Sequence, residues 1–94
     1  MRVRWSLPAI HQLIAIRDYI ASDNPTAANR VATDIMNAVD RLATFPRMGR
    51  QGRNAGFREL VISGWPYIVV YRIVDDVIDV SSVLHTSQQW PDEL

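Results

Sequence analysis

The stretch "YIVVYRIVDDVIDVSSVL", from Tyr67 to Leu84, decides the fold because it holds two strand-forming runs joined by two aspartates. Tyr67–Val74 is nearly continuous in β-branched and aromatic residues, which is typical of a central strand covered on both faces. Asp75–Asp76 has the length of a two-residue hairpin loop. Val77–Leu84 alternates, which predicts two faces: Ile78, Val80 and Leu84 inward, and Asp79, Ser81 and Val83 outward.

A third strand is expected immediately before this hairpin. Phe57–Ser63 alternates, with Arg58, Leu60 and Ile62 on one face and Phe57, Glu59 and Val61 on the other. Gly64–Pro66 then turns the chain. Three consecutive strands with short turns predict an antiparallel meander.

The N-terminal half predicts a short strand and two helices. Arg2–Trp5 alternates and is interpreted as the first strand. Ser6 can cap a helix that runs to about Ala21, with Pro8 in its first turn. Asp23 or Asn24 can cap a second helix, in which Pro25 takes the first position. Apolar residues at helical spacing mark the inner faces: Ile10, Leu13, Ile14, Ile20 and Ala21 in the first helix, and Ala28, Val31, Ala32, Ile35, Val39 and Leu42 in the second, which is expected to end near Phe45–Pro46.

These elements predict a single domain, residues 1–94, of the α+β class. The expected order is β-α-α-β-β-β, in which a helical hairpin packs on one face of a small antiparallel sheet. The chain has no cysteine, which excludes disulfides and cysteine-based metal sites. It also has no apolar run long enough for a membrane span, and its first residues do not resemble a secretory signal. We therefore expect a cytoplasmic protein with no membrane partner.

Positive charge gathers in the glycine-rich connection Phe45–Leu60, although the formal net charge of the chain is zero. The basic residues of this connection are Arg47, Arg50, Arg53 and Arg58. One interpretation is a solvated basic loop, and the other is a surface that grips acidic side chains or phosphates. The isoelectric point of about 6.7 favours an acidic protein partner over nucleic acid.

Other chemistry is sparse in the sequence. There is no metal-ligand spacing and no phosphate-binding glycine loop, and we expect neither a metal nor a cofactor. His85 is interpreted either as a surface histidine or as a general acid or base, with Ser87 or Asp79 as its partner. Tyr67 and Tyr71 are expected to pack in the sheet, and Trp90 to be a hydrophobic anchor.

Several motifs together resemble the RelE/ParE superfamily of bacterial toxins. They are the helix start "DNPTAANRVATDI", the turn "FPRMGRQG", the strands "FRELVISGWPYIVVYRI" and the end "VSSVLHTSQQWP". The resemblance extends from Trp5 to Pro91, and the ParE, or plasmid-stabilisation, branch fits best. It implies a growth-inhibiting toxin of a type II toxin–antitoxin module with the β-α-α-β-β-β fold.

The resemblance also implies partners. A cognate ParD-like antitoxin would neutralise the toxin by wrapping its C-terminal segment across it, which gives a hetero-oligomer. Contact with DNA would be indirect, through the antitoxin. ParE-like members inhibit DNA gyrase, whereas RelE-like members are ribosome-dependent endoribonucleases that cut mRNA.

One strand position favours gyrase as the target. Many ribonuclease toxins have a basic residue where this chain has Ile68, and an isoleucine can neither stabilise phosphorane charge nor move protons. The tail from His85 to Gln89 also contains no arginine or lysine. No catalytic residue is therefore expected; if the protein is a nuclease, the candidates are Arg58, Arg72 and His85. The residues expected to bind antitoxin or target are Arg47, Arg50, Arg53, Arg58, Arg72, His85, Gln88 and Trp90.

Overall fold

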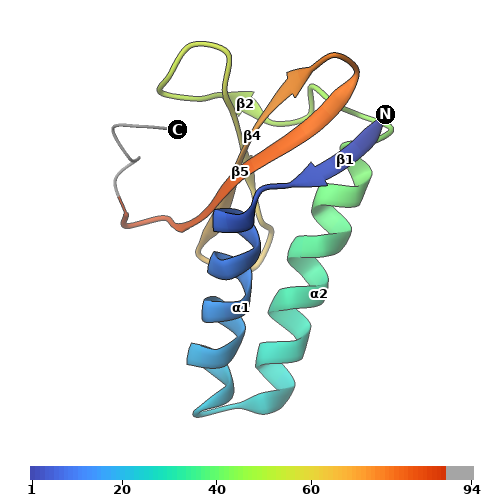
Figure 1. Cartoon of the computed structure of the whole chain (residues 1–94). Coiled ribbons are helices and arrows are strands. Elements are labelled where there is room, and N and C mark those ends of the chain that lie inside the picture. Colours follow the sequence, from blue (N-terminus) through green and yellow to red (C-terminus); the bar gives the residue numbers. More distant parts are fainter. Residues whose placement is uncertain (89–94) are drawn as a thin grey trace.

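A computed structural model, which describes residues 1–88, shows two helices packed on one face of a five-stranded sheet (Figure 1). The α+β class expected from the sequence is confirmed. α1 and α2 lie side by side, and the turn that joins them lies far from the sheet (Figure 1). The elements are β1 (Arg2–Trp5), α1 (Leu7–Ala21), α2 (Pro25–Arg41), β2 (Arg50–Gln51), β3 (Arg58–Val61), β4 (Tyr67–Val74) and β5 (Val77–His85).

The strand order is β1-β5-β4-β3-β2, so the expected meander forms the centre of the sheet. The sheet is mixed rather than wholly antiparallel, because β1 pairs with β5 in parallel. The two strands are separated by most of the chain, so no tight turn forces them to be antiparallel. β2 is also new: it pairs with β3 inside the glycine-rich connection, where no strand was expected. Arg50 on this short strand lies opposite Glu59 and forms an ion pair with it, in which Nε and Oε1 are 2.9 Å apart.

Both faces of β4 are covered, as the sequence indicated, and residues Tyr67 to Tyr71 are all buried. Tyr67, Val69 and Tyr71 join the main core between the sheet and the helices. Ile68 and Val70 form a smaller cluster on the opposite face, together with Leu84 and the partly buried Phe57.

A β-bulge inverts the expected faces of β5 beyond its centre. Val70 pairs with Ser82 and Tyr71 with Val80, so Ser81 is the extra residue. Ile78 and Val80 point into the main core as expected, but beyond the bulge Val83 joins them and Leu84 packs on the other face. The expected inward Leu84 and outward Val83 are therefore exchanged, because one additional residue shifts a two-residue alternation.

The helices begin where the sequence indicated. The Ser6 hydroxyl accepts a hydrogen bond from the Ala9 N–H at 3.1 Å, and the Asn24 side chain accepts one from the Ala27 N–H at 3.1 Å. The α2 stripe is confirmed for Ala28, Val31, Ile35, Val39 and Leu42, although α2 itself ends at Arg41. The α1 stripe is confirmed for Leu13 and Ile20, but Ala9 and Ile16 complete this inner face, and the expected Ile10 and Ile14 are partly exposed. Neither helix has the length and apolar character needed to cross a lipid bilayer.

Candidate functional site

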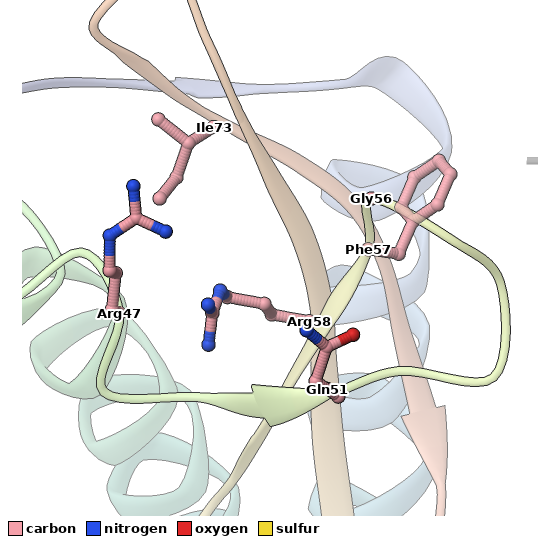
Figure 2. Close-up of a pocket in the computed structure, with 6 residues that line it drawn as sticks. All are labelled: Arg47, Gln51, Gly56, Phe57, Arg58 and Ile73. Atoms are coloured by element: carbon pink, nitrogen blue, oxygen red, sulfur yellow. The ribbon is translucent and has the colours of Figure 1, made fainter.

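A pocket of about 290 Å³ lies where the α2–β2 connection meets the ends of β3 and β4 (Figure 2). Arg47 reaches it from the connection and Arg58 from β3, and both guanidinium groups point into the same space (Figure 2). Among residues 1–88, the pocket is lined by Arg47, Gln51, Gly56, Phe57, Arg58 and Ile73. We call this the arginine pocket.

The backbone N–H and carbonyl of Gly49 are held by two side chains beside this pocket, an arrangement that we call the clamp. The Tyr71 hydroxyl accepts a hydrogen bond from the Gly49 N–H at 2.9 Å and donates one to the Pro46 carbonyl at 2.8 Å. Arg58 Nη1 donates to the Gly49 carbonyl at 2.8 Å. These bonds hold the two ends of the segment that carries Arg47, and they tie it to a tyrosine with no exposed surface.

Gly49 leaves no room for a side chain at this clamp. A Cβ atom there would lie 2.6 Å from both Cε1 and the hydroxyl oxygen of Tyr71, and 2.9 Å from the Glu59 carbonyl. Burial raises the pKa of Tyr71, although the hydrogen bond with Gly49 and the charge of Arg58 act in the opposite direction. The hydroxyl therefore stays protonated at neutral pH and can donate to Pro46.

The arginines of the connection differ in how their charge is balanced. Arg50 is paired with Glu59, whereas Arg47 and Arg53 form no ion pair within residues 1–88. Arg58 contacts a neutral carbonyl rather than a carboxylate. The positive charge of the arginine pocket therefore comes from Arg47 and Arg58, and an anion between them would find donors from two guanidinium groups.

Arg72 belongs to a different surface. Its Nε lies 3.5 Å from Asp79 Oδ2, and its guanidinium carbon lies 5.4 Å from the centre of the Phe57 ring. Asp79 also pairs with Arg4 on β1, with Nε and Oδ1 3.4 Å apart. This network lies on the sheet face away from the helices, because Arg72 alternates with the core residues Tyr71 and Ile73.

His85 lies at the opposite end of the strands. Its ring makes an edge contact with Tyr67, with ring centres 5.5 Å apart. Its Nδ1 is 2.8 Å from the Ser87 hydroxyl and accepts from the Ser87 N–H at 3.1 Å, so Ser87 rather than Asp79 is its partner. The Gln88 side chain accepts a hydrogen bond from the His85 backbone N–H at 2.6 Å. Trp90 lies outside the described residues.

The structure thus brings together Arg47 and Arg58, and it does not gather Arg58, Arg72 and His85. In the strand register, Arg58 lies opposite Tyr71 and His85 lies opposite Tyr67. These two tyrosines are four residues apart on β4. Four strand residues span about 13 Å. Arg72 is on the other face. Within residues 1–88 there is also no group of three or more histidine, aspartate or glutamate side chains that could hold a metal ion.

Two features of this site were not predicted from the sequence: the contact of Tyr71 with Gly49 and an apolar groove beside the pocket. Tyr71 was expected to pack in the sheet, but no spacing rule connects its hydroxyl with a glycine 22 residues earlier. The apolar groove has a volume of about 520 Å³. Phe45 and Met48 are apolar residues in a turn, where side chains are expected to be exposed. Their exposure was the sequence signal that could have indicated the groove.

Sequence comparisons relate the chain to known toxins. The family model described as "ParE toxin of type II toxin-antitoxin system, parDE" matches residues 3–90. "Putative toxin Y4kP" of Sinorhizobium fredii is 48% identical over 93 residues, which cover 99% of this chain and 96% of that protein. "Toxin RelE2" of Caulobacter vibrioides is 37% identical over 87 residues, which cover 93% and 97% of the two chains.

Solved structures agree with this relationship. A chain of the chromosomal ParDE toxin–antitoxin system from P. aeruginosa superposes with a TM-score of 0.83 at 25% identity, covering 90% of this chain and 95% of that one. A chain of the intact E. coli RelBE complex gives a TM-score of 0.61 at 13% identity, covering 93% and 98%, which shows a shared fold alone. The match of the family model to nearly the whole sequence establishes that the chain belongs to the ParE toxin family of type II toxin–antitoxin systems.

Proposed function

We propose that this toxin stops growth by binding and inhibiting DNA gyrase, rather than by cutting nucleic acid. The observation that carries the proposal is the dispersal of the nuclease candidates. Arg58 and His85 pair with β4 residues that are four positions apart, and Arg72 lies on the other face of the sheet in an ion pair with Asp79. General acid–base chemistry needs groups within hydrogen-bond reach of one reacting centre, whereas an inhibitor needs only a binding surface.

We further propose that a cognate antitoxin neutralises the protein in a cytoplasmic hetero-oligomer, as in a plasmid-stabilisation module. The match to a chain of a ParDE system supports such a partner. The arginine pocket supports an acidic contact, because Arg47 and Arg58 point into one cavity (Figure 2). DNA would be contacted through the antitoxin, since the toxin has no net charge.

An expression experiment tests the proposal in cells. The chain is induced in a bacterial host that carries a reporter plasmid, with and without the antitoxin encoded next to the toxin gene. We expect growth to stop, plasmid isolated from these cells to lose negative supercoiling, and antitoxin to reverse both effects. Growth arrest with fully supercoiled plasmid would contradict gyrase as the target.

The second candidate is ribosome-dependent mRNA cleavage. The observation that favours it is the 37% identity with a relative named "Toxin RelE2". If this activity is correct, mapping of mRNA 5′ ends after induction should show new cuts. Replacing Arg58, Arg72 or His85 with alanine should then remove the cuts while the protein remains folded. Intact messages during growth arrest would exclude this candidate.

A further inference from the structure

A groove with an almost wholly apolar surface adjoins the arginine pocket. It has a volume of about 520 Å³ and is lined by Thr44, Phe45, Pro46, Arg47 and Met48. Phe45 is 61% exposed and Met48 44% exposed, so large apolar side chains are in contact with water here. Such a groove is typical of a site where a partner inserts an apolar side chain.

Arg47 lines both the apolar groove and the arginine pocket. A ligand that places an apolar side chain in the groove therefore contacts Arg47, whose guanidinium points into the arginine pocket (Figure 2). Arg58 points into the same pocket as the Arg47 guanidinium (Figure 2). The two cavities thus form one surface, apolar at one end and cationic at the other.

The backbone that forms this surface is fixed before any partner arrives. The Pro46 carbonyl and the backbone N–H and carbonyl of Gly49 are hydrogen-bonded to Tyr71 and Arg58. Since Arg47 and Met48 lie between these anchored residues, little backbone freedom remains to be lost on binding. Because this surface is preorganised, binding loses less of its favourable free energy to ordering of the backbone.

We propose that the groove and the arginine pocket together dock one segment of the antitoxin, in which a bulky apolar side chain neighbours a carboxylate. This inference rests on the proposed neutralisation by an antitoxin. The charge is complementary, because no acidic residue within 1–88 forms an ion pair with Arg47. An acidic peptide fits better than nucleic acid, because phosphates gain nothing from the apolar groove and the chain carries no net positive charge.

Two pairs of matched variants test this docking surface. Met48→Gln alters the groove and is compared with Met36→Gln on α2, where Met36 is 51% exposed. Arg47→Glu alters the pocket and is compared with Arg30→Glu, an exposed arginine on α2. Each purified variant is first melted to confirm folding and is then titrated with purified antitoxin over a series of salt concentrations.

We expect Met48→Gln and Arg47→Glu each to weaken antitoxin binding at least about tenfold, which is typical of residues at the centre of an interface. Arg47→Glu should also reduce the salt dependence of the affinity, whereas Met48→Gln should leave it unchanged. Met36→Gln and Arg30→Glu should bind within about twofold of the wild type. If Met48→Gln fails to fold, Phe45→Ser is used for the groove.

The outcomes separate this inference from the proposed function. If the wild-type toxin does not bind the antitoxin, the proposed neutralisation fails. If the wild type binds and the Met48 and Arg47 variants bind like their controls, only the docking surface is refuted. The surface is also refuted if Arg47→Glu instead abolishes binding of a single-stranded RNA oligonucleotide while antitoxin affinity is unchanged.

A competition experiment identifies the segment itself. Overlapping 12-residue peptides that cover the antitoxin sequence are used to displace the intact antitoxin. The competing peptides should contain aspartate or glutamate next to leucine, isoleucine, phenylalanine or tryptophan, and should lose potency against Arg47→Glu. Competition only by peptides without an acidic residue would overturn the proposal.

Discussion

At the scale of single residues, Gly49 has no room for a larger side chain. In Gly49→Ala the new methyl group would lie 2.6 Å from Tyr71, which is buried and cannot move away freely. Overpacking of this kind costs about 1–3 kcal/mol of the free energy of unfolding. Thermal melting should therefore show a clear decrease in Tm. An unchanged Tm would mean that the clamp is looser than described.

Tyr71→Phe tests the hydrogen bonds of the clamp without emptying the core. The substitution leaves the Gly49 N–H and the Pro46 carbonyl without their partner, which should cost about 1–3 kcal/mol. Tyr67→Phe is the matched control, because Tyr67 lies on the same face of β4 in the same core. Urea unfolding should show a smaller loss for Tyr67→Phe, and equal losses would contradict the clamp.

The raised pKa of Tyr71 also gives a pH dependence. Burial favours the neutral phenol in the folded state, so the folded pKa is above the ordinary value of 10.0. The contribution of the neutral Tyr71 phenol to the free energy of unfolding is complete below pH 10, and it is lost as the pH rises through the folded pKa. The free energy of unfolding should therefore fall above pH 10, and it should fall less steeply in Tyr71→Phe. Equal slopes for the two proteins would show that Tyr71 does not cause the decline.

The sequence identified the arginines of the connection but could not tell which of them are balanced by acids of the same chain. Arg50 pairs with Glu59 only because β2 forms and brings the two residues opposite each other. Arg72 was grouped with Arg58 by type, but strand alternation places the two on opposite faces. Charge counts along the chain do not contain this information, because it arises from strand pairing.

At the scale of elements, the start of α2 was predicted to within one residue. Asp23 and Asn24 were both candidates for the cap, and Asn24 takes this role by accepting from the Ala27 N–H. Asn24→Ala should therefore lower the free energy of unfolding by about 1 kcal/mol. Asp23→Ala is the control and should have little effect. Chemical unfolding would contradict the assignment if Asp23→Ala were the more damaging change.

Helices and the central hairpin were predictable because hydrophobic period and capping chemistry are local signals. The bulge at Ser81 was not, because it reflects tertiary bonds. The Ser6 N–H donates to the Val80 carbonyl at 3.0 Å, and the Ser6 hydroxyl donates to the Ser81 carbonyl at 3.1 Å. The parallel pairing of β1 has the same non-local origin. The exchange of Val83 and Leu84 follows from that bulge.

At the scale of the whole molecule, the end of the chain should separate toxicity from folding. Truncation after Leu84 removes the edge contact of His85 with Tyr67 and the hydrogen bond from the Thr86 N–H to the Pro66 carbonyl. The core between the helices and the sheet remains. We predict a folded domain that still binds antitoxin but no longer stops growth. Growth arrest by the truncated chain would refute this prediction.

Inhibition of gyrase is the central claim, and supercoiling of relaxed plasmid tests it most directly. Purified, folded toxin is added to gyrase, and purified antitoxin is then added to the same reaction. We expect supercoiling to be lost in proportion to the added toxin and to be restored by antitoxin. Complete supercoiling in the presence of excess folded toxin would contradict the account and would make ribosome-bound mRNA the next target to test.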